Sequence, residues 1–367
     1  MIVFLAFLIW LYLFFLHGRF WESAPELQPT EPLTHPDVDI IVPARDEAET
    51  IGPVIASLVS QDYGGKFRVI LVDDNSTDGT AEKAGAHERL TILSGQPKPE
   101  GWSGKLWALS QGVAASTAPV LLFTDADITH NPRHLATLVA RLQTPRADMV
   151  SEMVRLNCAS LAERFLIPAF VYFFQMLYPF AKVNDPAART AGAAGGTVLI
   201  RREALARIGG LEKIKGALID DCTLAREVKR GGPIYLGHSG LATSIRPYPQ
   251  ARDIWNMIAR TAFTQLNYSA ALLLGTILGM AVVWLAAPLA ILFSGFGWRF
   301  FLGLATFGLA CLSYLPTLQR YKQPYYFALA LPGIALFYMA ATIASAVNHW
   351  RGTGAQWKSR AYGDQRQ

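Results

Sequence analysis

Cysteine is scarce in this chain of 367 residues, which contains three: Cys158, Cys222 and Cys311. Three scattered thiols are odd in number and match no metal-ligand spacing, so we expect neither a disulfide framework nor a structural zinc site. Reduced thiols are typical of proteins that face the cytoplasm. The sequence therefore excludes the class of small, disulfide-stabilised secreted domains.

Charged residues are also few, at 17%, whereas 51% of the residues are hydrophobic. The formal net charge is +5, but the basic residues are dispersed and no aromatic RNA-binding pattern accompanies them. We therefore expect no nucleic-acid partner. A domain that lies against anionic lipids of the inner leaflet explains the positive charge better.

Apolar residues are concentrated at the two ends of the chain. The first 16 residues are nearly all hydrophobic, and further apolar stretches cover residues 270–296, 300–318 and 325–347. The three late stretches each reach the ~20 residues that a membrane span needs, and the first is slightly short. A cleaved signal peptide fits the first stretch poorly, because no basic segment precedes it and no small-residue cleavage site follows it.

These patterns divide the chain into six parts. We expect an N-terminal transmembrane helix over residues 1–18, a proline-rich linker over 19–36, a globular domain over 37–252, an interfacial helix over 253–268, about three transmembrane helices over 269–348 and a tail over 349–367. Within the globular domain, residues 165–183 are apolar but interrupted by prolines. We expect them to lie in the membrane interface, because a crossing would separate acidic motifs before and after them.

The distribution of basic residues favours a multi-pass protein whose globular domain lies inside. Arg19 follows the first apolar stretch, and Arg320 and Lys322 separate the last two. The tail does not fit this topology, because four spans would place it outside although it contains four basic residues: Arg351, Lys358, Arg360 and Arg366. The number of late spans and the side of the tail therefore stay open.

The middle of the chain alternates strand and helix patterns. Residues 38–43 and 67–72 are apolar strand patterns, and each precedes a polar loop and a helix. Thr80 looks like the cap of the second helix. Two strand–loop–helix units in succession predict an α/β fold with a mixed, mainly parallel sheet.

A third strand, residues 120–123, ends in Asp125-Ala126-Asp127. Ligands of open α/β sheets bind at the carboxyl ends of the strands. Two aspartates there can hold a divalent cation through oxygen, and the cation can hold a diphosphate. A lone Asp-x-Asp is more often a solvated turn or a helix cap, so this motif depends on the signals around it.

Polar residues follow the other strands as well, and each has an ordinary alternative. Arg45 and Glu47 can present polar groups to a nucleotide or simply form a polar loop. Asp73 and Asp74 offer carboxylates, and one carboxylate can accept the imide N–H of a uracil-type base; the alternative is a turn. Lys105 can place an ammonium on a diphosphate or be a solvated lysine.

A second acidic pair, Asp220 and Asp221, opens a helical pattern. The simple interpretation is helix capping, and the functional one is a general base for an acceptor hydroxyl. His238, at a later strand end, fits a structural histidine better than a metal ligand.

Together, these five motifs over residues 38–260 resemble the inverting glycosyltransferases of family 2, which have the Rossmann-like GT-A fold, and they stand in the family's order. The resemblance implies a cytoplasmic nucleotide-sugar donor, most often UDP-linked, and Mg²⁺ or Mn²⁺. It also implies site residues. Those for the donor are Pro43, Ala44, Arg45, Glu47, Asp73, Asp74, Lys105, Asp125 and Arg260; those for the metal are Asp127 and Asp125; Asp221 is the catalytic base, with Asp220 beside it.

The glycine run at 192–196 resembles the acceptor-side loop of the family, where small residues let a substrate approach the backbone. Processive members carry Gln-x-x-Arg-Trp after the catalytic acid, but only Arg260 remains here, which favours a single transfer. The narrower resemblance is to bacterial hopene-associated glycosyltransferases, through Gly-Trp-Ser-Gly-Lys-Leu-Trp-Ala at 101–108 and Ala-Arg-Thr-Ala-Phe-Thr-Gln at 259–265.

That resemblance implies a protein of the bacterial plasma membrane that transfers a sugar to a lipid hydroxyl, such as that of a hopanoid. Two alternatives stay open. The acceptor can be a polyprenyl phosphate, which is already an anion and needs no strong base. The chain can also be an inactive scaffold that binds nucleotide sugars without turnover.

Overall fold

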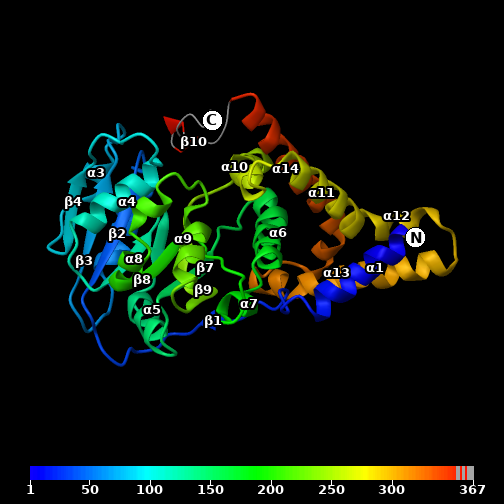
Figure 1. Ribbon diagram of the computed structural model, residues 1–367, viewed down its shortest axis with the longest axis horizontal. Helices are drawn as coiled ribbons and strands as arrows, with labels where there is room; N and C mark the ends of the chain where they lie inside the picture. The colour runs from blue at the N-terminus through cyan, green and yellow to red at the C-terminus, as the bar shows by residue number, and fades with distance from the viewer. Residues whose placement is uncertain (353–355, 358–359, 362–367) are drawn as a thin grey trace. The chain divides into compact units, whose positions relative to one another are not determined.

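The computed structural model describes residues 1–352, 356–357 and 360–361, which form two compact units (Figure 1). The first unit comprises Met1–Ser23, Cys158–Ala181 and residues 247–352. The second comprises Ala24–Asn157 and Lys182–Arg246, together with the described residues 356–357 and 360–361. Much of the predicted tail, including Lys358 and Arg366, lies outside the described residues.

The second unit is built on a nine-stranded sheet in the order β1-β9-β7-β8-β5-β2-β3-β4, with β6 paired to β9. Its strands are β1 Glu26–Leu27, β2 Val38–Ala44, β3 Phe67–Asp73, β4 Leu90–Ser94, β5 Val120–Thr124, β6 Ile128–His130, β7 Met149–Arg155, β8 Thr197–Arg201 and β9 Ile234–Ser244. Strand β8 runs antiparallel to β5 and β7, and β6 antiparallel to β9; the other pairs are parallel. The predicted α/β fold with a mixed, mainly parallel sheet is confirmed.

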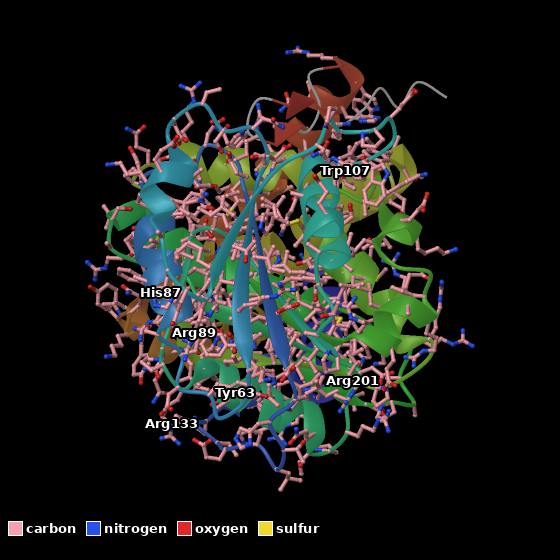
Figure 2. All side chains as sticks on the ribbon, turned by 90° about the vertical axis from the view of Figure 1, so that its left-hand side faces the viewer. Tyr63, His87, Arg89, Trp107, Arg133 and Arg201 are labelled. Atoms are coloured by element: carbon pink, nitrogen blue, oxygen red, sulfur yellow. The ribbon has the colours of Figure 1, made fainter. Side chains whose placement is uncertain are left out.

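The centre of the sheet is apolar because its strands are covered on both faces. All seven residues of β2 are buried, and Val38, Ile40, Val42 and Ala44 belong to the main hydrophobic core. The helices of this unit are α2 Ile51–Val59, α3 Thr80–Ala84, α4 Gly104–Ala114, α5 His134–Gln143, α8 Arg202–Arg207 and α9 Asp220–Lys229, with a 3₁₀ turn at Leu211–Ile214. Figure 2 shows Trp107 of α4 at one end of the central strands and Tyr63 and Arg201 at the other.

The first unit is helical. Its elements are α1 Ile2–Phe15, α6 Leu161–Leu177, α10 Ala251–Gln265, α11 Ala270–Met280, a π-helical turn Ala281–Leu285, α12 Ala286–Phe293, α13 Trp298–Arg320, a 3₁₀ turn Tyr325–Ala330 and α14 Leu331–Trp350. Within the described residues, three helical segments are long and apolar enough to cross a membrane: Ala270–Phe293, Trp298–Arg320 and Tyr325–Trp350. They match the three late stretches predicted from hydropathy.

The N-terminal helix is shorter than the predicted span. Helix α1 has 14 residues, against the ~20 that a membrane span needs. Its Trp10 is fully buried, donates to the Val283 carbonyl at 2.9 Å and packs edge-on against Trp284. Helix α1 is therefore anchored to the other apolar helices of its unit, and its role as a span stays a prediction.

The two predicted interfacial segments are helical. Residues 165–183 contain most of α6, with Pro168 inside it, and most of α7 (Phe180–Asn184). Residues 253–268 contain most of α10. Neither α6 nor α10 is among the described helices that are long and apolar enough to cross a membrane. Their location in the interface stays a prediction.

Candidate active site

The site lies where the order of the strands reverses. The chain adds β3 and β4 on one side of β2 and then returns to place β5 on the other side. The pairing of β2 with β5 ends at Ile41 and Phe123, so the two strands separate beyond that point. Pro43 follows the separation, where its missing N–H leaves no gap in a ladder. Open α/β sheets bind ligands at such a switch point.

A pocket at this point brings together five of the predicted site residues. Side chains from the end of β2, the start of α4, the end of β5 and the start of α9 line it: Pro43, Lys105, Asp125, Asp220 and Asp221, with Thr124 and Gly195 beside them. Trp107, two residues after Lys105 on α4, marks the same end of the sheet in Figure 2. The donor-side and base-side residues therefore share one pocket.

Lys105 is held in the site by carboxylates. Ser103 caps α4 by accepting the N–H of Leu106, which fixes the first turn where Lys105 lies. Its Nζ lies 2.8 Å from Asp125 Oδ1 and 3.5 Å from Asp220 Oδ2. Burial alone would lower the pKa of Lys105, but the aspartates outweigh it and raise that pKa above its usual value. Lys105 is thus a permanent cation in the pocket.

Asp220 and Asp221 are the first two residues of α9, as predicted, but they do not cap it. The N-cap is Ile219, which has no side-chain cap bond. Asp221 Oδ1 accepts the N–H of Cys222 at 2.7 Å. Burial and then the neighbouring charge of Asp220 raise the pKa of Asp221 to about 7, although Lys105 opposes the shift. Helix capping therefore does not account for an aspartate at position 221. A carboxylate with a pKa near 7 suits a general base.

The predicted glycine loop packs against Asp221. A Cβ on Gly195 would lie 3.1 Å from Asp221 Oδ2, so any larger residue would crowd the carboxylate. The thiol of Cys222 donates to the Ala193 carbonyl at 3.3 Å. The loop and the start of α9 therefore form one wall of the pocket.

The loops after β2 and β3 are joined by hydrogen bonds. Asp74 is fully buried, and its N–H donates to the Ala44 carbonyl at 2.8 Å. Arg45 Nη1 donates to the Asp74 carbonyl at 2.5 Å and lies 3.7 Å from its carboxylate. Glu47 N–H donates to Thr80 Oγ1 at 2.8 Å. The residues predicted to contact the nucleoside thus form one cross-linked surface.

Two details differ from the sequence interpretation. The N-cap of α3 is Gly79, and Thr80, predicted as the cap, instead accepts the Glu47 N–H. Asp73 Oδ1 accepts the N–H and the hydroxyl of Ser76, so this carboxylate closes its own turn.

Arg246 is a site residue that the sequence analysis missed. It follows β9 by two residues, and the preceding Ile245 N–H donates to the Asp127 carbonyl at 2.8 Å. Its guanidinium donates to Asp127 Oδ2 and, at 2.6 Å, to Glu47 Oε1. Burial and Asp125 raise the pKa of Asp127, and Arg246 opposes them. No local motif marks Arg246, because its partners lie 119 and 199 residues away in the chain.

The acidic residues fit a metal that binds together with a diphosphate. Within the described residues, no group of three or more His, Cys, Asp and Glu side chains could hold a metal ion by itself. Asp125 and Asp127 supply two carboxylates, which Lys105 and Arg246 neutralise. Mg²⁺ is usually held by one or two carboxylates plus substrate phosphates and water. The two aspartates match that pattern.

Two remaining residues are not among those that line the pocket. Arg260 is exposed on α10, in the first unit, whereas the residues above belong to the second. His238 is fully buried on β9, in register with Glu26 of β1 and Met153 of β7. The prediction that His238 ends a strand is wrong, because it lies inside β9 with a strand on either side. Its burial there agrees with the interpretation as a structural histidine.

Comparison with known proteins identifies the domain. Residues 39–209 match the family model described as glycosyl transferase family 2. The glycosyltransferase AglE of Haloferax volcanii is 31% identical over 140 residues, which are 36% of this chain and 45% of the relative. The 4,4'-diaponeurosporenoate glycosyltransferase of Staphylococcus aureus is 34% identical over 95 residues, or 26% of this chain and 25% of the relative. The chain thus spans less than half the length of these relatives.

A solved structure resembles nearly the whole chain. The mannosyltransferase PcManGT of Pyrobaculum calidifontis, in complex with GDP-Man and Mn²⁺, aligns with a TM-score of 0.58 and 22% identity. The alignment covers 95% of both chains. At this identity the likeness concerns the fold. The match over residues 39–209 shows a glycosyltransferase family 2 domain, and the solved structure shows that its fold is GT-A.

Proposed function

We propose that this protein is a membrane-bound, metal-dependent inverting glycosyltransferase that moves one sugar from a nucleotide sugar to a lipid hydroxyl. The observation that carries the proposal is the position of Asp221. Its carboxylate, with a pKa raised to about 7, lines the same pocket as Lys105 and Asp125. A general base and a diphosphate-binding cation are therefore within one site.

The donor occupies the end of the pocket formed by β2, β3 and β5. The cross-linked loops, which contain Arg45 and Asp74, hold the base, and Lys105 binds the diphosphate. Asp127 and Asp125 hold Mg²⁺ or Mn²⁺, which supplies charge neutralisation for the leaving diphosphate. The complex of PcManGT with GDP-Man and Mn²⁺ supports this class of donor and metal. We propose UDP as the nucleotide from the family resemblance.

Asp221 acts on the acceptor. Its ionised carboxylate takes the hydroxyl proton while the acceptor oxygen attacks the anomeric carbon from the face opposite the diphosphate. The new carbon–oxygen bond forms as the bond to the diphosphate breaks, so the anomeric configuration inverts. The missing side chain at Gly195 leaves the Asp221 carboxylate uncrowded on that side. The products are the glycosylated lipid, the nucleoside diphosphate and protonated Asp221.

The acceptor is a membrane lipid at the cytoplasmic face of the bacterial plasma membrane. Three apolar helices long enough to span a bilayer support a location beside such a substrate. One relative is named for 4,4'-diaponeurosporenoate, which supports a lipid-like acceptor. The resemblance to hopene-associated enzymes makes a hydroxylated hopanoid the acceptor that we propose.

The test is turnover by the full chain in detergent or vesicles. UDP-sugars are supplied with Mn²⁺, and UDP release is measured with no lipid, with a hydroxylated hopanoid and with a polyprenyl phosphate. We expect lipid-dependent UDP release and a glycosylated product by mass spectrometry in the hopanoid sample. Product in the polyprenyl phosphate sample alone would establish the other acceptor class. Nucleotide binding without turnover on any donor would establish a scaffold.

A further inference from the structure

Four buried polar side chains form a continuous hydrogen-bonded chain that leads away from the active site. Thr124 Oγ1 lies 3.1 Å from His130 Nε2, His130 Nδ1 lies 2.9 Å from His134 Nδ1, and His134 Nε2 lies 2.5 Å from Glu152 Oε1. Each of the four residues is at most 5% exposed. We call these four residues the buried chain. His130, His134 and Glu152 belong to none of the motifs that indicated the function.

The first hydrogen bonds of the buried chain have a defined direction. Thr124 Oγ1 also lies 2.9 Å from the Gly196 carbonyl, which can only accept, so the hydroxyl donates there. The same hydroxyl oxygen therefore accepts a hydrogen bond from the Nε2–H of His130. Burial lowers the pKa of His130 well below its usual value, so its ring is neutral. His130 Nδ1 is then an acceptor and receives the Nδ1–H of His134.

The far end of the buried chain shares one proton. His134 Nε2 and Glu152 Oε1 face each other, and either can hold the proton between them with no net charge on the four residues. If the Thr124 hydroxyl pointed to His130 instead, both rings would turn their protons toward Glu152. That carboxylate would then be ionised next to neutral groups. Among the described residues its Oε2 has no hydrogen-bond partner, so an uncompensated charge there would be costly.

The Thr124 hydroxyl, which the buried chain orients, holds the backbone of Gly196 between Asp125 and Asp221. The Gly196 carbonyl, which accepts from Thr124, also accepts the Asp125 N–H at 3.3 Å. The adjacent Gly195 packs against the carboxylate of Asp221. The segment that includes both glycines is therefore fixed to the end of β5 on one side and borders Asp221 on the other.

We propose that the buried chain is a positioning device for the transfer reaction: by holding Thr124 on the Gly196 carbonyl, it sets the spacing between Asp125 and Asp221. The proposal rests on the proposed function, in which the donor is held at Asp125 and the acceptor at Asp221. The residues of the buried chain are positioning residues. Their loss changes how often donor and acceptor are aligned, and donor binding is unaffected.

Substitution of Thr124 tests this proposal in the full chain. Thr124→Val keeps the shape and removes the hydroxyl, and Thr124→Ser restores it. We expect Thr124→Val to lower kcat roughly 10- to 100-fold, because a small misplacement of reacting groups has effects of that size. The affinity for UDP with Mn²⁺, measured by calorimetry, stays unchanged, and Thr124→Ser recovers most of the rate.

Thr137→Val is the matched control. Thr137 is 1% exposed on α5, and its hydroxyl donates to the Arg133 carbonyl at 2.7 Å. Thr137→Val therefore removes an equally buried threonine hydroxyl that does not line the pocket. We expect it to lower Tm without changing kcat. If Thr124→Val and Thr137→Val give the same kcat as the native chain, the hydroxyl positions nothing and the proposal fails.

A second measurement does not depend on activity or on the stability of a variant. Histidine-selective ¹⁵N labelling of the native chain reports which ring nitrogen carries the proton. We expect His130 to carry it on Nε2, and a far-downfield proton between His134 and Glu152 that disappears in Glu152→Gln. A His130 protonated on Nδ1 would reverse the direction of the buried chain and overturn the proposal. Absence of turnover on every donor with the expected tautomer would instead contradict the proposed function.

Discussion

Arg246 and Asp127 form an ion pair in which the guanidinium Nε donates to the carboxylate Oδ2, and the same guanidinium binds Glu47. The pair joins a residue after β9 to the Asp-x-Asp motif after β5. It neutralises the carboxylate that we assign to the metal. The charge of the site is therefore balanced by an arginine as well as by Lys105.

The first prediction concerns the metal. Asp127→Ala removes a carboxylate that, with Asp125, can hold Mn²⁺ or Mg²⁺ with the donor diphosphate. We expect the variant to lose turnover and its dependence on either metal. Asp62→Ala, at an exposed aspartate, is the control and keeps both. Full activity of Asp127→Ala in excess EDTA would contradict the assignment.

The second prediction concerns Arg246. Arg246→Met leaves Asp127 and Glu47 without their shared cation, and loss of a charged hydrogen-bond partner costs about 1–3 kcal/mol. We expect Tm without metal to fall, and Mn²⁺ to raise the Tm of the variant more than that of the native chain. Thermal unfolding with and without Mn²⁺ measures both effects. Equal Mn²⁺-dependent shifts in the two proteins would show that Arg246 and the metal act at separate places.

The third prediction concerns the general base. Asp221→Asn keeps the size and much of the hydrogen bonding of the side chain but cannot take a proton. We expect turnover to fall at least ~100-fold, the usual scale for loss of a general base, with donor affinity little changed. Turnover at saturation and the dissociation constant of the donor are the measurements. A collapse of donor affinity with normal saturated turnover would make Asp221 a binding residue.

The fourth prediction is the pH dependence of the reaction. The pKa of Asp221 is raised to about 7, chiefly by burial and then by Asp220. The base works in its ionised form, so kcat/KM rises with pH up to about 7 and levels off above it. A polyprenyl phosphate acceptor needs no strong base, so kcat/KM with that acceptor would not show this rise with pH. A rate profile that is flat between pH 5 and 8 with a hydroxyl acceptor would exclude Asp221 as the base.

The fifth prediction concerns residues 165–183. The motifs on either side belong to one site, so this segment must not cross the membrane. Single cysteines at Asn157 and Asp185, in a chain whose native cysteines are replaced, should both resist an impermeant thiol reagent in sealed cells. Both should react after the cells are opened. Opposite labelling of the two positions would show a crossing and refute a single cytoplasmic site.

Much of the fold and the donor side could be predicted from sequence because the signals are local. The apolar strand before Asp125 and the acidic start of α9 are each visible within ten residues, and the structure contains both. Thr80 was misassigned by one position, because its hydroxyl bonds the distant Glu47 instead of its own helix. Local patterns cannot separate these two uses of one hydroxyl.

The residues that the sequence analysis missed depend on the order of strands in the sheet. Arg246 meets Asp127 because β9 pairs with β6, and no spacing in the chain indicates this pairing. Likewise, Glu152 meets His134 across 18 residues and from a different element. In the sequence, Glu152 only interrupts the apolar pattern of a strand. In the structure, its carboxylate has His134 as a hydrogen-bond partner.

The interleaved construction of the two units has a consequence for biogenesis. Residues 158–181 of the helical unit are inserted between β7 and β8 of the sheet. The ribosome therefore makes α6 before it makes β8 and β9, which flank β7 on its two sides. The sheet can close only after this helix has emerged, so the catalytic unit cannot finish folding before the chain has begun to build its apolar partner. Trimming the chain from either end cannot separate the two.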